Sequence, residues 1–477
     1  MLCTTASPLL PLLQRESTAA QEYTPEPWPS VHLPLEEGAL PSRAGARRLS
    51  PTGVSSHSSA PSTPSCSACV PPPSWYVDPE FLELEKERLF FKTWQYAGPL
   101  SKLKEPGDYF TGSLLGRGFV VCMDDDRTIR AFHNICSHRA AAVATGEGKV
   151  PVTDAPATAG VSGLRFECPY HGWQFDMRGR FRGCKVAHGL TGIRDFSPDT
   201  SSLNPLRVDT WGPLVFLYWG DEGDAPPPVA EFLGDGGKQL SGELATAAGH
   251  ASPADGSPSD WQFHKRVEYP MACNWKCMTD NYMDGNYHVF LCHPGLIGCL
   301  SMYNNANLLY DNVAMLTGPS EQPDAWPKEG QPGGPLHHQM VTRTRGGKDQ
   351  SYSCLYPNTF INRYGQWFSV TNVVPLGPTK CMTTFDLFFR PDTLANDKEF
   401  IALAEVAEDE LQNEDIALCL AVGANLASPM YAAGRYAPIE APMWWHHQRL
   451  HKDLFGSAPG LKHRPTDDRM NKIMYTA

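Results

Sequence analysis

Hydrophobic and polar positions follow different patterns in successive parts of this chain of 477 residues. The first 72 residues show no sustained apolar period and are dominated by Ser, Pro and Ala. From Asp78 onward apolar residues return at helical spacing, which predicts a helix. Between residues 107 and 220, short β-forming runs alternate with turn residues, and this alternation predicts a small all-β domain.

The remaining sequence divides at about residue 260. Residues 221–260 are rich in Gly, Pro, Ala, Ser and Asp, which predicts a linker or insertion with at most one short helix. Beyond Trp261 the pattern predicts strands around residues 352–390 and helices around 279–292 and 397–425. We therefore expect a disordered tail at 1–72, an N-terminal helix with the β domain at 73–220, a linker at 221–260 and a second domain of α+β class at 261–477.

The tail has the composition of an organelle transit peptide in its second half. Residues 42–72 contain no Asp or Glu but include Arg43, Arg47 and Arg48. Several glutamates lie earlier, so a disordered tail with no address is the alternative. A transit peptide would direct the protein to the chloroplast stroma; otherwise we expect it in the cytoplasm.

Composition narrows the possible partners. A net charge of -12 argues against nucleic acid, and no apolar run of 18 or more residues predicts a membrane span. The 14 cysteines have irregular spacing, which is typical of reduced thiols and not of a disulfide framework.

The β domain contains a pair of motifs that mix cysteine with histidine. Cys136 and His138 form a Cys-x-His motif, and Cys168 and His171 form a Cys-x-x-His motif within Cys-Pro-Tyr-His-Gly-Trp. A Rieske [2Fe–2S] centre needs two thiolates on one iron and two imidazoles on the other, so each loop would give one ligand to each iron. Zinc is the alternative, but zinc sites usually group Cys with Cys and His with His.

A second metal site is predicted in the C-terminal domain. His288 and His293 are five residues apart, so a helix end or bulge is needed to aim both at one metal. Two histidines and one carboxylate bind iron(II) and leave positions open for oxygen and substrate. Asp415 is the best candidate for the carboxylate, and Glu414 is the second choice.

These motifs identify a family. The sequence resembles the Rieske non-haem iron oxygenases, and within them the choline monooxygenase branch. The matching stretches span nearly all of residues 73–455 and include 73–76, 91–95, 168–173, 273–276, 280–293, 356–358, 361–365, 375–378 and 434–436. The resemblance implies an all-β Rieske domain followed by a helix-grip-like α+β catalytic domain with an antiparallel sheet.

The resemblance also assigns roles to residues. Cys136, His138, Cys168 and His171 match the cluster ligands, and the mononuclear iron ligands match His288, His293 and Asp415. Asp284 most nearly matches the catalytic carboxylate that links the two centres between subunits. Many family members carry that carboxylate three residues before the first iron histidine, where this chain has Gly285.

The activity implied by the resemblance is a monooxygenase reaction with O2 on a quaternary ammonium substrate. Choline, oxidised to betaine aldehyde, is the first expectation; glycine betaine and carnitine share its head group and would favour a pocket arginine such as Arg363. Aromatic faces bind such head groups, and the candidates for an aromatic cage are Tyr282, Tyr287, Phe290, Tyr364 and Trp367.

The same resemblance implies a homo-oligomeric ring, expected to be a homotrimer. No Gly-x-Gly-x-x-Gly follows a strand, so the electrons should come from a separate ferredoxin or reductase. Two non-catalytic alternatives remain: an electron carrier that uses only the cluster, and a relative that binds an amine without turnover.

Overall fold

The computed structural model of the chain describes residues 70–152, 163–186, 190–220, 226–248, 261–296, 306–318, 340–341, 343–345, 350–431 and 434–456. Every described residue lies in the compact unit formed by residues 64–477. Apart from residues 70–72, the predicted tail therefore lies outside the described residues. None of the helices in the described ranges is long and apolar enough to cross a membrane.

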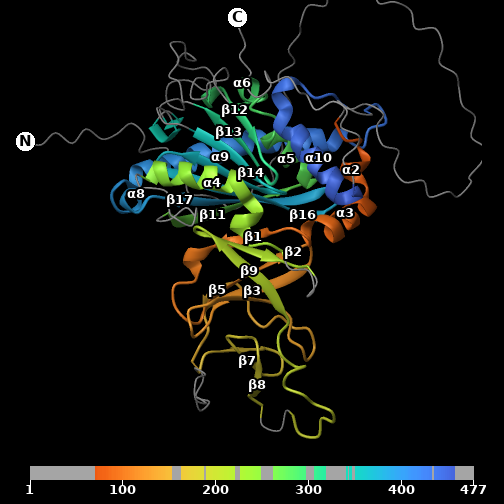
Figure 1. The fold of residues 1–477 in the computed structure, drawn as a ribbon, viewed down its shortest axis with the longest axis vertical. Helices are drawn as coiled ribbons and strands as arrows, with labels where there is room; N and C mark the ends of the chain where they lie inside the picture. Colours follow the sequence, from red (N-terminus) through yellow and green to blue (C-terminus); the bar gives the residue numbers. More distant parts are fainter. Residues whose placement is uncertain are drawn as a thin grey trace, which may run out of the picture. The chain divides into compact units, whose positions relative to one another are not determined.

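The predicted β domain consists of two antiparallel sheets (Figure 1). The larger sheet has the order β1-β10-β9-β4-β3-β2-β5 and the smaller has the order β6-β7-β8. Their strands are β1 (Gln95–Pro99), β2 (Asp108–Leu114), β3 (Arg117–Met123), β4 (Ile129–His133), β5 (Glu147–Lys149), β6 (Arg165–Glu167), β7 (Trp173–Asp176), β8 (Phe181–Cys184), β9 (Pro205–Trp211) and β10 (Leu214–Tyr218).

A second antiparallel sheet with seven strands forms the centre of the C-terminal domain, in the order β11-β17-β16-β15-β14-β13-β12. The strands are β11 (Gln262–Met271), β12 (Ala306–Leu309), β13 (Val313–Gly318), β14 (Gln350–Leu355), β15 (Thr359–Tyr364), β16 (Trp367–Gly377) and β17 (Lys380–Phe389). The helices near it are α5 (Trp275–Tyr282), α6 (Val289–Cys292), α8 (Pro391–Asn396), α9 (Lys398–Asn425) and α10 (Ala441–Phe455). This architecture confirms the expected α+β fold class.

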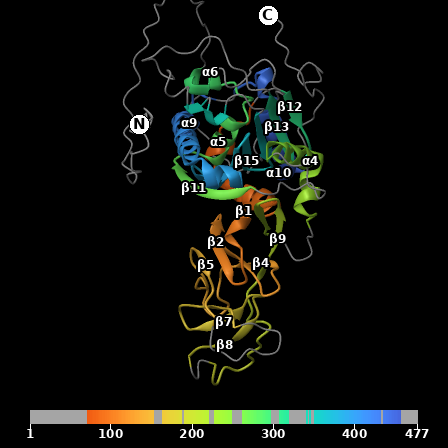
Figure 2. The ribbon, with the colours of Figure 1, turned by 90° about the vertical axis from the view of Figure 1, so that its left-hand side faces the viewer.

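Both faces of the central strand β15 are buried. Successive side chains of a strand point to opposite faces. In β15, Phe360 belongs to a core formed with α5 and α10, and the next residue, Ile361, belongs to a core on the other face. In both ribbon views, β7 and β8 lie at the opposite end of this unit from α6 (Figures 1 and 2).

The segment predicted to be a linker contains a substantial helix. Helix α4 (Val229–Ala248) is interrupted by a kink at Gly234 and buries Leu233, Leu240 and Leu244 in the core with Ile361. Sequence reasoning expected at most a short helix, because the Gly and Ser residues hid the apolar period. This part of the segment packs as a layer of the C-terminal domain.

The N-terminal helix also packs on the C-terminal domain. It comprises α2 (Ser74–Val77), α3 (Pro79–Glu85) and the π-helical turn η1 (Lys86–Phe90), and Asp78 caps α3 by accepting from Glu80 N at 2.9 Å. The ring of Trp75 lies 6.0 Å from that of Phe455 in α10. The sequence grouped this helix with the β domain, and its buried residues belong to one core cluster that includes residues of both domains.

One buried ion pair connects this N-terminal segment to α5. Lys276 Nζ lies 2.6 Å from Glu85 Oε1, and both side chains are completely buried. Trp275 Nε1 donates to the second oxygen of Glu85 at 3.1 Å. Burial raises the pKa of Glu85, and Lys276 opposes this rise. The pair fixes the start of the helix that leads into the second predicted metal site.

Replacing Lys276 with methionine should destabilise the fold by roughly 3–5 kcal/mol, because it leaves the Glu85 carboxylate buried without its counter-ion. Denaturant or thermal unfolding of the metal-loaded protein measures this effect. Lys238→Met is the matched control: Lys238 pairs with Asp235 on the exposed surface of α4, and its loss should cost less than about 1 kcal/mol. Equal stability of the two variants would contradict the importance of the buried pair.

Candidate active site with two metal centres

Two loops of the β domain present the mixed Cys and His motifs in the same backbone shape. Ala140 N donates to Cys136 O at 2.9 Å, and Gly172 N donates to Cys168 O at 3.0 Å. Each cysteine N–H in turn donates to the carbonyl five residues later. Ala140 and Gly172 hold equivalent positions, with φ of 59° and 70°. The chain thus forms two matching loops, each carrying one cysteine and one histidine.

The donor atoms of these loops fit an iron–sulfur cluster. Cys136 and Cys168 are each 2% exposed and carry free thiols. Burial, together with a hydrogen bond to the Cys168 thiol, raises the pKa of Cys136. The rings of His138 and His171 lie 4.5 Å apart, and the buried Nδ1 of His171 has no hydrogen-bond partner. Two thiols and two neighbouring imidazoles, one with an unpartnered buried nitrogen, are the donors that a Rieske [2Fe–2S] cluster needs.

Aromatic residues pack around these histidines, and the site reaches the surface. Trp173 stacks on His138 with a centroid distance of 4.7 Å and an interplanar angle of 8°. Tyr170, whose ring lies 3.8 Å from that of His171, is 56% exposed. The site therefore combines a buried sulfur side with an exposed histidine edge.

The second predicted site lies at the non-helical turn between α5 and α6. Gly285 and Asn286 have φ of 71° and 68°, which ends the helix that the sequence predicted to continue through residues 279–292. His288 and His293 flank the short helix α6, so the expected helix end is present. A Cβ at residue 285 would lie 2.2 Å from the carbonyl oxygen of Ile439. The close approach of this backbone excludes a carboxylate at 285.

Two imidazole nitrogens and one carboxylate oxygen converge at this turn. The Nε2 atoms of His288 and His293 lie 3.1 Å apart, and Asp415 Oδ1 on α9 lies 3.3 Å and 3.0 Å from them. Each Nδ1 atom faces its own carboxylate: Asp284 Oδ2 lies 2.7 Å from His288, and Glu414 Oε2 lies 2.6 Å from His293. Glu414, the second choice for a metal ligand, thus contacts the outer nitrogen of a histidine.

This geometry fits a metal ion. A carboxylate at Nδ1 fixes the proton there, so each Nε2 presents a lone pair toward the other and toward Asp415. Three such donors about 3 Å apart repel one another unless a cation or protons lie between them. Two histidines and one carboxylate on one side suit non-haem iron(II) and leave positions open.

Titration of the site reflects the same convergence. Burial lowers the pKa of His288, but hydrogen bonds with Asp284 and Asp415 outweigh it and raise the pKa to about 10. Burial raises the pKa of Asp415, but both histidines outweigh that effect and hold it below its usual value. In the absence of metal, protons therefore occupy this site at neutral pH, and metal binding must displace them.

The three converging residues form part of the wall of a pocket. Besides the metal donors, the pocket is lined by apolar groups, by phenol rings and by several amide and charged side chains. Its lining comprises Met278, Asn281, Tyr282, Asn286, His288, Val289, His293, Leu296, Arg345, Tyr352, Asn362, Tyr364, Phe385, Glu408, Leu411, Gln412 and Asp415.

Comparison with known proteins decides the family. Residues 93–193 match the Rieske [2Fe-2S] domain, and residues 258–454 match the catalytic domain of the ring hydroxylating alpha subunit. The chain is 36% identical to the chloroplastic choline monooxygenase of Arabidopsis thaliana, over 83% of this chain and 85% of the relative. It is 33% identical to that of Spinacia oleracea, over 87% and 86%. The chain is a Rieske non-haem iron oxygenase of the choline monooxygenase family.

More distant matches are a bacterial relative in sequence and solved structures with a similar fold. The carnitine monooxygenase oxygenase subunit of Escherichia coli K12 is 25% identical over 76% of this chain and 85% of its own. A quaternary ammonium Rieske monooxygenase in complex with L-carnitine has a TM-score of 0.63 at 21% identity, over 80% of this chain and 95% of that one. A naphthalene 1,2-dioxygenase has a TM-score of 0.61 at 16% identity, over 81% and 92%.

Membership of this family settles the cofactors. The Rieske oxygenase carries a [2Fe–2S] cluster and a mononuclear iron, as the sequence predicted. The residues at the two sites form suitable donor sets, and the sequence-predicted ligands are the residues that converge there. The predictions for the individual ligands remain proposals.

The expected aromatic cage is only partly assembled. Tyr282 and Tyr364 line the pocket. Tyr287 and Phe290 are 56% and 44% exposed and are absent from the lining, because the turn before α6 directs them outward. Trp367 is fully buried and lies behind Tyr364, with a centroid distance of 4.6 Å.

Sequence reasoning missed several lining residues of the Rieske oxygenase. Tyr352 lies in β14, and the pocket arginine is Arg345, not Arg363. Arg363 lies near Ser351 and near Glu243 of α4. Alternation along β15 could have shown that Arg363 faces away from the pocket, since Arg363 and Ile361 share one strand face.

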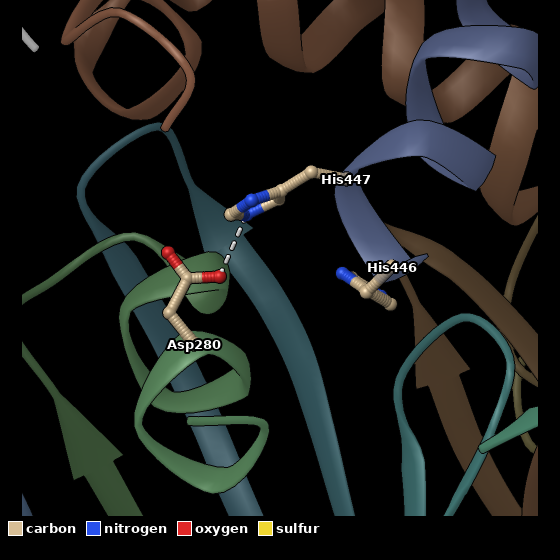
Figure 3. A group of neighbouring side chains, drawn as sticks. All are labelled: Asp280, His446 and His447. Carbon is tan, nitrogen blue, oxygen red and sulfur yellow. Dashed lines mark hydrogen bonds and ion pairs between the residues drawn. The ribbon is translucent and has the colours of Figure 1, made fainter. Parts of the chain in front are cut away.

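A second group of potential ligands, Asp280, His446 and His447, lies between α5 and α10 (Figure 3). His447 Nε2 lies 2.9 Å from Asp280 Oδ1, and its Nδ1 lies 2.7 Å from the Tyr436 hydroxyl. Tyr76 donates to Asp280 Oδ2 at 2.6 Å. Burial lowers the pKa of His446 to about 4, so this ring is neutral. Because protein groups already satisfy Asp280 and His447, we assign this group a structural role in joining α2, α5 and α10.

Proposed function

We propose that this Rieske oxygenase oxidises the alcohol carbon of choline to betaine aldehyde, using O2 and electrons from a ferredoxin-like donor. The observation that carries the proposal is the donor set of His288, His293 and Asp415 on the wall of a pocket that also contains phenol rings. The identity to choline monooxygenases over most of the chain supports this substrate.

The proposal assigns ligands to both centres. Cys136, His138, Cys168 and His171 would hold the cluster, and the other three residues would hold the iron. When bound, these groups supply one-electron transfer and O2 activation. Overall, one oxygen atom enters a C–H bond of the alcohol carbon, and the other leaves as water with two electrons and two protons. The product is the hydrate of betaine aldehyde.

The protein's own part is orientation and exclusion of water. Asp284 and Glu414 each fix the tautomer and ring plane of one iron histidine, so both Nε2 atoms face the same point. Apolar residues such as Met278, Leu411 and Phe385 line the pocket beside them and limit the entry of water. The substrate carbon is thereby presented to one fixed position.

The arrangement of the two sites within one chain supports electron transfer between subunits. The loop of Cys168 and His171 leads directly into β7, which lies at the far end of the unit from α6 (Figures 1 and 2). One solved relative is described by its inter-subunit electron transfer. We propose a homotrimeric ring in which Asp284 connects His288 to a cluster histidine of a neighbouring subunit.

The proposed preference for choline rests on the ion pair that the pocket arginine already makes. Arg345 pairs with Glu408 and lies under the ring of Tyr364, 4.6 Å from its centroid. A carnitine or glycine betaine carboxylate would have to displace Glu408 from it. Choline carries no carboxylate and requires no such exchange.

We also propose a stromal location. Relatives in Arabidopsis and spinach are chloroplastic by name, and residues 42–72 have the composition of a transit peptide. Stromal ferredoxin would then be the natural donor.

Product analysis tests the proposed reaction. Anaerobically reconstituted and chemically reduced protein is exposed to O2 with choline, glycine betaine or carnitine in parallel. We expect betaine aldehyde from choline and little product from the two carboxylates. Product from carnitine alone would move the assignment to that substrate. No product from any of the three, with both centres filled, would disprove a quaternary ammonium oxygenase.

A further inference from the structure

One face of helix α9 connects the iron site to a second carboxylate in the pocket. Glu408, Leu411, Gln412 and Asp415 all line the pocket and follow the spacing i, i+3, i+4 and i+7. Residues at that spacing share one helix face, and seven residues rise about 10.5 Å along the axis. Glu408 therefore lies two turns from the iron ligand, on the same side of the helix.

Glu408 is held rigidly. Its Oε2 pairs with Arg345, and its Oε1 accepts a hydrogen bond from Ser369 Oγ at 2.8 Å. Arg345 is 2% exposed, whereas Glu408 is 7% exposed, so the carboxylate is the more accessible member of the pair. The arginine is further covered by the rings of Tyr364 and Trp367.

The phenol rings of the pocket have faces that neighbours already cover. Phe360 lies 4.2 Å from Tyr282 between ring centroids, and Tyr364 packs against Trp367 and Arg345. The Tyr282 hydroxyl donates to Asn362. Few aromatic faces are therefore free to surround a cation. A cation in this pocket needs a negatively charged group in addition to these rings.

We propose that Glu408 is the counter-charge for the substrate ammonium, and that α9 sets the distance from this charge to the iron. This inference rests on the proposed choline oxidation and names the residue that selects for charge. A quaternary ammonium has no N–H to donate, so a carboxylate attracts it only through the field at its methyl groups. In choline the oxidised carbon lies two bonds from the nitrogen. In this proposal the ammonium lies near Glu408, and the alcohol carbon points along α9 toward Asp415 and the proposed iron site.

The test compares choline with 3,3-dimethylbutan-1-ol, which replaces the charged nitrogen by carbon without changing the shape. Dissociation constants are measured by anaerobic calorimetry on holoenzyme with both centres filled. Glu408→Gln should weaken choline binding by about tenfold or more and leave binding of the neutral isostere unchanged. Glu405→Gln, whose carboxylate pairs with Lys265 away from the pocket, is the matched control and should change neither constant.

A second variant controls for the possibility that Glu408→Gln misfolds because Arg345 loses its partner. Arg345→Met combined with Glu408→Gln removes both charges and leaves no buried ion unpaired. This double variant should also lose the preference for choline over the isostere. If either folded variant keeps the wild-type preference, Glu408 is only a structural partner of Arg345. If wild type binds no choline at all, the proposed function itself fails, and this inference fails with it.

Discussion

Replacing Asp415 with alanine should abolish product formation and empty the catalytic iron site while the [2Fe–2S] cluster stays in place. Asp415 supplies the only carboxylate oxygen within about 3 Å of both histidine Nε2 atoms among the described residues. Without it, two neutral imidazoles remain, which form a weak site for a hard divalent ion. Loss of metal-assisted activation is worth several kcal/mol, so we expect product formation to fall by at least about a thousandfold.

Iron content and spectroscopy distinguish this result from general damage. The variant should contain two irons per chain instead of three, and the reduced cluster should keep its electron paramagnetic resonance signal. Asp409→Ala is the matched control on the same helix, because that carboxylate accepts from Tyr269 at 2.6 Å and lies outside the pocket lining. A variant at 415 that keeps three irons and its activity would remove Asp415 from the ligand set.

The parts of the protein that sequence reasoning predicted well are those with local signals. Each cluster loop carries both of its ligands within four residues, so the chemistry can be recognised before any fold is known. The helix at 397–425 and the strands at 352–390 have long and regular patterns, and α9 and β14–β17 confirm them. The third proposed iron ligand, Asp415, lies far from the histidines in sequence, and the family resemblance supported its choice.

The features that were missed depend on long-range packing. The glycines of helix α4 obscure its apolar period, and its buried leucines show their role only in the folded chain, where they pack in one core with Ile361 of the sheet. Tyr287 and Phe290 lie within a few residues of the iron histidines, but a two-residue stretch with positive φ turns them toward the surface. Proximity in sequence to the histidines does not determine which side chains near this turn face the pocket.

The carboxylates that contact the two histidines also have roles that depend on long-range packing. Glu414 was the second choice for the carboxylate ligand after Asp415, and adjacent residues on a helix point in directions about 100° apart. Asp415 therefore faces the Nε2 atoms, and Glu414 reaches the Nδ1 of His293. The sequence favoured Asp415 as the ligand, but only the structure shows that Glu414 contacts the other nitrogen of His293.

Changing Asp284 to asparagine should lower steady-state turnover by about 100-fold with both metal centres still filled. The carboxylate accepts from the backbone of Tyr287 and His288 at 3.0 Å and contacts His288 Nδ1 at 2.7 Å. Asparagine keeps the size and can preserve the backbone contacts, but it removes the charge that supports the imidazole. Losing such an outer carboxylate typically costs 10- to 100-fold in metal affinity or activity, and the proposed electron route adds to this loss.

Glu414→Gln separates orientation from electron transfer, because Glu414 makes the equivalent contact with the other iron histidine, at 2.6 Å. Both variants are loaded with iron to saturation, the cluster is reduced, and its reoxidation by O2 with choline is followed by stopped flow. If Asp284 connects the centres, reoxidation slows markedly in Asp284→Asn and stays near the wild-type rate in Glu414→Gln. Equal slowing in both variants would reduce Asp284 to an orienting residue. Because a side chain at 285 would collide with the Ile439 carbonyl, residue 284 is where this chain can place the carboxylate, and the comparison tests whether that position serves the electron route.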